Sequence, residues 1–419
     1  MSNKFQVHVL IIGAGIGGLA AAIGIARAGY QVTVIEKSSQ LGEKGAGIQV
    51  PPNSSHILSR WGLLKTLSAE AMQPGSIIIR SYHDDSILSK LKLKGRDSIE
   101  EAYDYPWLHI HRETLHKALS DEATQHGVVF RLGSTVAGID FQNSTVRIQD
   151  QKIISADIII GADGVNSVCR EALLGRPDPP VLTGDMVYRI SLSTTEMKKH
   201  VELEALATKP NFNYWAGPGE HAVGYLIEHG TQFNIVIAAK DNLPFSFSRG
   251  KGDVNEMRER FEGWSSTFTL LLELASESTV WRLCCGREME TWTHGGGSFS
   301  LLGDACHSML PYLAQGAAQA VEDGAVLGAL FSRCESREDV FDVLGVYEEL
   351  RMPRANMVAR VSREKVGMRW RDSGEGSLNP WANLNFQKEL FGYDVEGEVD
   401  NTWNRYKAAT AEMRKSNSQ

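Results

Sequence analysis

The sequence contains only five cysteines, and no two of them form a Cys-x-x-Cys pair. An odd number without repeated spacing excludes a disulfide framework, and the missing pair argues against zinc ribbons and dithiol redox sites. No apolar run reaches the roughly 18 residues that a membrane span requires. Because the chain has no basic cluster and a net charge of −8, we expect neither a membrane nor a nucleic-acid partner. No secretory leader pattern opens the sequence, so a reducing, cytoplasmic location is expected.

The chain has enough apolar material for more than one core. Of its 419 residues, 42% are hydrophobic and 22% are charged, and this length predicts two or three domains. Residues 7–12 predict a buried strand, residues 17–28 a closely packed helix, and residues 31–36 a second strand. Together they make a strand–helix–strand unit of about thirty residues.

A glycine fingerprint lies between the first of these strands and the helix. Gly13 permits the tight turn after the strand, Gly15 lets the backbone approach a pyrophosphate, and Gly18 allows the helix to pack close to the sheet. Glu36, at the end of the second strand, can accept hydrogen bonds from an adenosine ribose. The pattern predicts a dinucleotide site, although it does not distinguish NAD from FAD.

Two later motifs favour a flavin. Residues 161–164 read GADG and residues 303–304 read GD, and each motif follows an apolar strand. A helix is expected to begin near residues 315–317, and its N-terminus favours negative charge, such as that on the pyrimidine side of a reduced flavin. Residues 295–297, the remaining glycine run, predict only a loop, so no second dinucleotide fingerprint exists for a nicotinamide cofactor.

The remaining stretches divide between helices and sheet. Residues 186–239 have the pattern of a separate sheet-rich domain. Further strands are expected at residues 76–93, 128–140, 144–149 and 153–160, and helices at residues 54–67, 111–126, 317–330 and 339–363. The polar C-terminal tail, with its scattered aromatic residues, predicts helical packing with a frayed end.

These motifs resemble those of the single-component, FAD-dependent aromatic hydroxylases, the group A flavoprotein monooxygenases. The resemblance is closest to the salicylate-hydroxylase-like branch common in fungi. It is carried by GAGIGG (13–18), GAGIQVPPNSSHILSRWGL (45–63), HIHRETLHKAL (109–119), GADGVNS (161–167), GDACHSMLPYLAQGAAQAVEDGAVLG (303–328) and LFGYD (390–394). It therefore spans nearly the whole chain.

The resemblance implies an α/β fold of two domains. A Rossmann-like FAD-binding domain would be interleaved with a sheet-rich substrate domain and followed by a C-terminal helical segment, as in p-hydroxybenzoate hydroxylase. The implied FAD-binding domain takes residues 1–75, 105–183 and 285–370, the substrate domain takes 76–104 and 184–284, and the C-terminal segment takes 371–419.

The resemblance also implies an activity. The protein would consume NADPH or NADH, as a transient co-substrate, and insert one oxygen atom of O2 into a phenolic or other electron-rich small aromatic substrate through a flavin C4a-hydroperoxide. It would act as a monomer or homodimer. Alternatives are a monooxygenase acting on an indole or polyketide ring by epoxidation or dearomatisation, a flavin dehydrogenase that never uses O2, and a non-catalytic escort protein with a flavin fold.

Cofactor contacts follow by resemblance as well. Glu36 would bind the adenosine ribose, Arg112 would reach the FAD near its pyrophosphate and ribityl chain, and Asp304 would bind the ribityl hydroxyls. Asp163 would support both FAD and nicotinamide. The implied set also includes Pro311 beside the isoalloxazine, the backbone amides of Gly316 and Ala317, and Lys37 and Gly47.

Two positions depart from the family pattern or need a plainer explanation. Ala314 stands where relatives often have glycine, which mildly changes the loop near the flavin. His307 is expected to be a capping or hydrogen-bonded histidine and not a proton shuttle.

The chemistry of the substrate selects two further residues. A phenol is best attacked as the phenolate, so the site needs a positive charge or hydrogen-bond donors near the phenol oxygen. Arg189 is the candidate partner of that oxyanion and Tyr225 the candidate donor, although a structural ion pair and sheet packing would also explain them. Tyr188, Trp215 and His221 are weaker candidates for the pocket wall.

Overall fold

Five parallel strands far apart in the sequence form the first sheet. Their order is β18-β11-β1-β2-β7, and every neighbouring pair is parallel. The strands are β1 (His8–Ile12), β2 (Gln31–Ile35), β7 (Val129–Arg131), β11 (Ile158–Gly161) and β18 (Phe299–Leu301). Because β1, β11 and β18 are adjacent and parallel, the three glycine motifs that follow them meet at one edge of the sheet.

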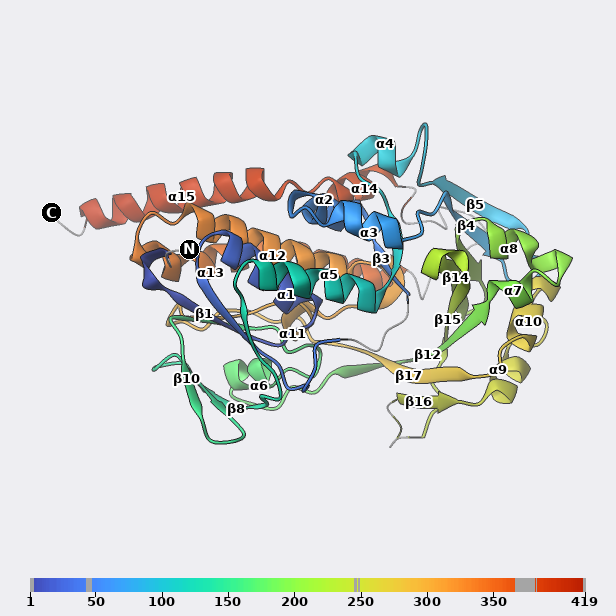
Figure 1. The fold of residues 1–419 in the computed structure, drawn as a ribbon, viewed down its shortest axis with the longest axis horizontal. Coiled ribbons are helices and arrows are strands. Elements are labelled where there is room, and N and C mark those ends of the chain that lie inside the picture. The colour runs from blue at the N-terminus through green and yellow to red at the C-terminus, as the bar shows by residue number, and fades with distance from the viewer. Residues whose placement is uncertain are drawn as a thin grey trace.

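This structure is a computed structural model, and it describes residues 4–42, 47–244, 247, 249–365, 381 and 383–416. Figure 1 shows an elongated molecule with the parallel sheet and the long helices in one half and a second, larger sheet in the other. Within the described ranges, no helix combines the length and apolarity needed to cross a bilayer.

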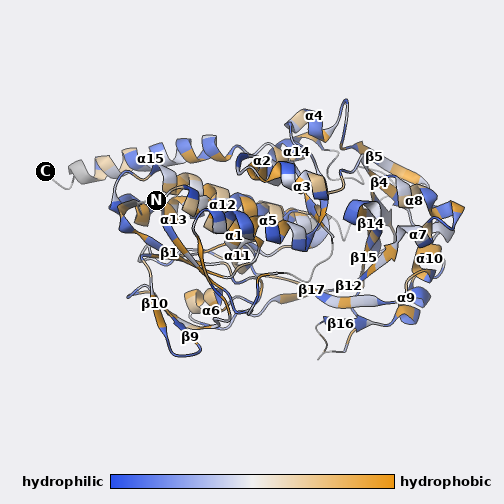
Figure 2. Ribbon diagram, viewed as in Figure 1, coloured by the Kyte–Doolittle hydropathy of each residue, from blue (hydrophilic) through white to orange (hydrophobic). Residues whose placement is uncertain are grey.

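Long helices cover the parallel sheet. In Figure 2 the strand β1 is mostly hydrophobic, whereas the outer helix α15 alternates hydrophobic and hydrophilic residues. The helices of this half are α1 (Ile16–Arg27), α2 (Pro52–Arg60), α3 (Leu64–Glu70), α5 (Arg112–Gln125), α6 (Val168–Leu174), α11 (Asp304–His307), α12 (Gly316–Arg333), α13 (Arg337–Lys365), α14 (Leu384–Phe391) and α15 (Val395–Ser416). Two small sheets join them, made of β3 (Gly47–Val50) with β6 (Leu108–His111), and of β8 (Val136–Asp140), β9 (Thr145–Ile148) and β10 (Ile153–Ser155).

Helices α1 and α12 cross at glycines. A Cβ on Gly24 would lie 2.4 Å from the carbonyl oxygen of Gly324, and a Cβ on Gly328 would lie 2.6 Å from the Cα of Gly24. The two backbones therefore touch, and this crossing brings the N-terminus of α12 close to the glycine fingerprint at the start of α1.

The second sheet has eight strands in the order β16-β17-β12-β15-β14-β13-β4-β5. All neighbours are antiparallel except β13 and β4, which are parallel. The strands are β4 (Ser76–Ser81), β5 (Ile87–Lys92), β12 (Val181–Ser193), β13 (Phe212–Ala216), β14 (His221–Ile227), β15 (Gln232–Lys240), β16 (Arg249–Gly252) and β17 (Ser278–Cys285). Because they come from residues 76–92 and 181–285, they support the proposed division of the chain into two interleaved domains.

The two faces of the eight-stranded sheet meet different partners. One face packs into a core with short helices, namely α7 (Thr194–Met197), α8 (Glu204–Thr208), α9 (Val254–Arg260) and α10 (Ser266–Glu273). The other face packs against the first half, in a cluster that contains Tyr225 together with Leu310, Tyr312 and Leu313. The expected α/β fold with a Rossmann-like domain and a sheet-rich domain is confirmed.

Several elements are shorter than the sequence pattern predicts. The helix expected at 54–67 is two helices, α2 and α3, because Gly62 adopts a φ of +83° between them. The strand expected at 128–140 is likewise divided into β7 and β8, with Gly133 at a φ of +64° in between. The strand expected at 153–160 is also two strands, β10 and β11. Of the C-terminal segment 371–419, α14 and α15 are described, whereas residues 371–380, 382 and 417–419 lie outside the described part, as do residues 366–370 before it.

Candidate active site

The turn between β1 and α1 accepts only glycine at two positions. Gly13 has a φ of +105°, and a Cβ there would lie 2.4 Å from the carbonyl oxygen of Ala162. A Cβ on Gly18 would lie 2.0 Å from the carbonyl oxygen of Gly13. Gly15 is the N-cap of α1 and makes no side-chain cap bond, so the first amides of the helix are available to an anion.

Glu36 lies beside this turn. Its carboxylate accepts hydrogen bonds from the backbone N–H of Ala14 and of Ser38, each at 2.9 Å. Burial raises the pKa of Glu36, but these two amides and the neighbouring Lys37 outweigh burial, so the pKa lies below its ordinary value. An ionised carboxylate has further lone pairs that could accept hydrogen bonds from ribose hydroxyls.

The turn after β18 presents two exposed side chains on an otherwise buried segment. Asp304 is exposed between buried Gly303 and Ala305, and Pro311 is exposed between buried neighbours on the turn η4 (Pro311–Leu313). Gly303 has a φ of +64°. Both side chains are therefore accessible to a ligand.

Arg112 and Asp304 come together although they are far apart in the chain. Burial lowers the pKa of Arg112, and the carboxylate of Asp304 opposes this shift. Arg112 begins α5 directly after β6, whose partner strand β3 begins at Gly47. The predicted cofactor contacts Arg112, Asp304 and Gly47 thus lie in one region. Residues 43–46, which include the first two residues of the 45–63 motif, lie outside the described part.

The start of α12 follows a strained residue. Ala314 adopts a left-handed conformation with a φ of +56°, which costs about 1–2 kcal/mol in a residue other than glycine. This is the position at which the sequence resemblance led us to expect glycine. Gly316 and Ala317, the first residues of α12, are partly exposed, as expected if their amides face a cofactor.

The sheet face that meets this region carries the substrate candidates. Arg189 pairs with Val236 and Val236 with Val223, so Arg189 and Val223 share one face of the sheet. Tyr225 and His221, two residues to either side of Val223 on β14, lie on the same face. The sheet register therefore unites Arg189, Tyr225 and His221 opposite the turn at Pro311.

Comparisons with known proteins agree with this geometry. A family model described as an FAD binding domain matches residues 6–241, more than half of the chain. FAD-dependent monooxygenase OpS4 from Beauveria bassiana (strain ARSEF 2860) is 34% identical over 421 residues, which cover 95% of this chain and 98% of that protein. The chain belongs to the FAD-dependent monooxygenases.

Two further comparisons extend this result. The 3-hydroxybenzoate 6-hydroxylase of Polaromonas naphthalenivorans (strain CJ2) is 30% identical to this monooxygenase over 365 residues, 86% of this chain and 88% of that protein. A solved salicylate hydroxylase substrate complex has the same fold, with a TM-score of 0.80 at 22% identity over 96% of this chain and 98% of that one. The protein is thus an oxidoreductase that uses FAD, and the escort and dehydrogenase alternatives are set aside.

Two weaker pocket candidates, Tyr188 and Trp215, lie on the opposite face of the eight-stranded sheet. Tyr188 donates its hydroxyl to Glu256 of α9, and the indole N–H of Trp215 donates to Asp85 at 2.7 Å. Both belong to the core under the short helices. The expectation that they line the pocket is wrong. Side chains alternate between the two faces of a strand, and Tyr188 and Trp215 lie on the face that packs against the short helices.

The side chain of Asp163 accepts hydrogen bonds from residues of the turn that follows it. Ser167 donates its hydroxyl to one oxygen of Asp163 at 2.5 Å, and the backbone N–H of Cys169 donates to the other at 3.1 Å. The carboxylate therefore holds the first turn of α6. Its part in binding FAD and nicotinamide stays a proposal, which would act through the shape of this turn.

Arg189 and Tyr225 each shift the pKa of the other. Burial lowers the pKa of Arg189, as does neighbouring Arg249, and Tyr225 opposes them. Burial raises the pKa of Tyr225 well above its ordinary value, with Arg189 opposing. No carboxylate forms an ion pair with Arg189 in the part of the chain that the structure describes, so a structural pair does not account for this cation.

A partly buried histidine, His221, and a buried one, His109, lie at this face. His221 stacks on Tyr214 at 5.0 Å between ring centroids and meets the edge of Tyr312 at the same distance. His109, from β6, lies 4.5 Å from the ring of Tyr225, and its Nε2 finds no hydrogen-bond partner among the described residues. His109 was not predicted as a site residue, although a polar residue in the apolar run before the helix at 111–126 was a signal for it.

Lowering the pH should destabilise the protein through these histidines. Burial lowers the pKa of His109 to about 3 and that of His221 to about 4, whereas an unfolded histidine titrates near 6.5. Between those values the unfolded chain binds more protons, so stability is complete above pH 6.5 and falls as the pH decreases below it. At pH 5.5 each histidine should cost roughly 1 kcal/mol.

Urea unfolding at pH 7.5 and pH 5.5 measures this loss. The variant His109→Phe keeps an aromatic ring against Tyr225 but removes one titrating group, so its loss of stability between the two pH values should be smaller than that of the wild type by roughly 1 kcal/mol. An identical loss in the two proteins would show that His109 is not held in its neutral form.

Proposed function

We propose that this monooxygenase uses NADPH or NADH and O2 to hydroxylate a small aromatic substrate that carries a phenolic hydroxyl. One observation carries the proposal: the sheet face opposite the turn at Pro311 combines aromatic rings with two neighbouring cations, Arg189 and Arg249, and no carboxylate of the described residues forms an ion pair with Arg189. The names of two relatives, 3-hydroxybenzoate 6-hydroxylase and salicylate hydroxylase, support a hydroxylated benzene ring as the substrate class.

Each residue of this face would have a different role in the reaction. Arg189 would stabilise the phenolate, and Tyr225 would donate a hydrogen bond to its oxygen. His221, which is neutral at pH 7 and contacts Tyr312, would form part of the aromatic wall of this face. Pro311 would form an apolar side of the reaction site and exclude water from it.

The cofactor would lie along the edge where the glycine motifs meet. FAD, once reduced by the nicotinamide, supplies the chemistry that activates O2. We propose that the pyrophosphate binds at the start of α1, that Glu36 and Lys37 lie at the adenosine, and that Arg112, Asp304 and Gly47 lie towards the flavin. Gly13, Gly15, Gly18, Asp163, Gly316 and Ala317 complete the proposed set.

Turnover with defined aromatic probes tests the function. We expect phenol carboxylates such as 3-hydroxybenzoate or salicylate to accelerate NAD(P)H oxidation and O2 uptake, and mass analysis to find one added oxygen atom, with loss of CO2 where the carboxyl group is at the attacked carbon. Stimulation by indoles alone, with none by any phenol, would overturn the phenol assignment.

A pair of variants tests Arg189 in the same assay. Arg189→Ala should lower the rate of hydroxylation about a hundredfold or more, while Arg189→Lys, which keeps the charge, should retain part of it. The FAD content of both variants should equal that of the wild type. Unchanged turnover in Arg189→Ala would remove this residue from the mechanism.

A further inference from the structure

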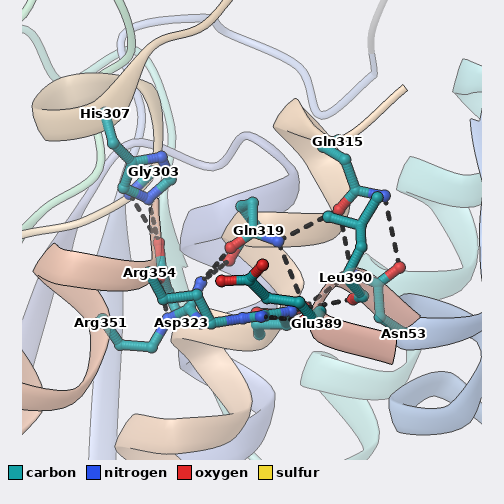
Figure 3. Close-up of polar contacts among 11 residues, drawn as sticks. Asn53, Gly303, His307, Gln315, Gln319, Asp323, Arg351, Arg354, Glu389 and Leu390 are labelled. Carbon is teal, nitrogen blue, oxygen red and sulfur yellow. Dashed lines mark hydrogen bonds and ion pairs between the residues drawn. The ribbon is translucent and has the colours of Figure 1, made fainter. Parts of the chain in front are cut away.

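A cluster of buried charges lies next to Gly303 and Gln315, which belong to the turns of the proposed flavin site (Figure 3). We call it the acid–arginine cluster, and it consists of Glu322 and Asp323 on α12 and Arg351 and Arg354 on α13. The side chains of Glu322, Asp323 and Arg351 are 0% exposed, and that of Arg354 is 10% exposed. Ion pairs join Arg351 to both acids, at 2.6 Å to Glu322 and 2.8 Å to Asp323.

Asp323 holds the turn that follows β18. Its Oδ2 accepts the backbone N–H of Gly303 at 3.1 Å and bonds to Nε2 of His307 at 2.6 Å. These two residues flank Asp304, the exposed carboxylate proposed to bind the ribityl chain. His307 is thus fastened to the carboxylate of Asp323, in agreement with the expectation that it is hydrogen-bonded.

Glu322 holds two other segments of the proposed site. Its Oε1 accepts the side-chain amide of Asn53 at 2.6 Å. Asn53 lies in α2, just after the strand that begins at Gly47, and it also donates to Oε1 of Gln315 at 3.0 Å. Gln315 precedes Gly316 and Ala317, whose amides are proposed to face the flavin. One glutamate therefore ties the segment after β3 to the start of α12.

The charges of the cluster balance. Burial raises the pKa of Glu322 and of Asp323, but Arg354, Arg351 and His307 outweigh burial, so both pKa values lie below their ordinary range. Two carboxylates thus face two guanidinium groups at neutral pH. Such a cluster is a weak source of stability, since apolar residues of the same size often replace buried ion pairs at no cost.

We propose that Glu322 and Asp323 are positioning residues for FAD. Each carboxylate bonds to a segment that contributes to the proposed flavin site: Asp323 to the turn at Gly303, and Glu322 through Asn53 to the segments of α2 and Gln315. Rigid attachment of these turns to one helix keeps the cofactor contacts in a fixed mutual geometry. The proposal depends on the binding of FAD and not on the identity of the aromatic substrate.

The test removes the bonds that lead from Glu322 to the other segments of the proposed site and leaves the charges of the cluster in place. Asn53→Ala deletes the hydrogen bond between Glu322 and α2. Gln315→Ala deletes the hydrogen bond between Asn53 and Gln315, while Glu322 keeps its ion pairs with Arg351 and Arg354. Tyr30→Phe is the matched control, because it removes a buried hydrogen bond of 3.1 Å to Phe331 at the other end of α12. FAD affinity is measured by titration of each apoprotein, together with the visible spectrum of the bound flavin.

We expect Asn53→Ala and Gln315→Ala to raise the dissociation constant of FAD by about tenfold or more and to change the shape of the flavin absorption bands. Tyr30→Phe should lower the melting temperature but keep the affinity within about twofold and the spectrum unchanged. If Asn53→Ala fails to fold, Gln315→Ala decides the question. Wild-type affinity and spectrum in the variants that fold would overturn the proposal, and this outcome is independent of whether any phenol is hydroxylated.

Discussion

Gly324→Ala should leave little folded, flavin-loaded protein. The added Cβ would lie 2.4 Å from the carbonyl carbon of Ala20 and 2.6 Å from the amide nitrogen of Ala21, both of them backbone atoms of α1. Backbone atoms cannot rotate away, so α1 and α12 would have to separate along their whole crossing. Overpacking of a close-packed core costs about 1–3 kcal/mol even where side chains can adjust, and more is expected here.

The matched control is Gly345→Ala in α13. A Cβ at this exposed helical position meets no atom within 4 Å. Alanine is favoured over glycine in a helix by about 1 kcal/mol, so this variant should be as stable as the wild type or slightly more stable. Soluble yield, bound flavin and thermal melting compare the two variants, and equal melting temperatures would contradict the close crossing of α1 and α12.

Arg170→Met should also cause a large loss of stability, about 3–5 kcal/mol. Arg170 is buried and pairs with buried Asp178 at 3.0 Å. Its other nitrogens donate to the carbonyl oxygens of Ala305 at 3.0 Å and Val165 at 2.9 Å, which connects the turn after β11 to the turn after β18. Methionine fills similar space but leaves these acceptors without their donor.

Exposed arginines that bind the same aspartate provide the comparison. Arg287, with a side chain 52% exposed, pairs with Asp178 at 3.0 Å, so Arg287→Met should cost less than about 1 kcal/mol. Chemical unfolding gives both free energies, and FAD titration should show weaker binding only in Arg170→Met, since Ala305 adjoins Asp304. If Arg287→Met lowered the free energy of unfolding as much as Arg170→Met, exposure of the arginine would not determine how much its ion pair with Asp178 stabilises the protein.

The cofactor half of the molecule was largely predictable from the sequence. The strand–helix–strand unit and the turn glycines follow from local sterics, and parallel strands necessarily bring their carboxyl ends to one edge. Gly13 and Gly18 were expected to permit a tight turn and close packing, and the short distances from their Cβ positions to backbone carbonyls show why. Helix and strand boundaries were less accurate where glycines such as Gly62 interrupt an apolar pattern.

The substrate side was harder to predict, because its residues meet only through tertiary structure. Alternation along β12 shows that Tyr188 and Arg189 face opposite ways, but not which of the two faces the other domain. His109 reaches Tyr225 from a strand of another sheet. The pair Glu322 and Asp323 resembles ordinary surface charge on a helix in the sequence, and its burial follows only from the arrival of Arg351 on α13.

The strand order has a consequence for synthesis on the ribosome. The edge strand β18 and the helix α12 are translated more than 250 residues after β1 and α1, at 299–301 and 316–333, yet they pack directly on the β11–β1 unit and on α1. A nascent chain that has not reached α12 leaves the apolar surface of α1 uncovered and cannot complete the site at the glycine turns. We therefore expect this apolar surface to stay exposed until residues 316–333 are made, and flavin loading to follow the synthesis of α12.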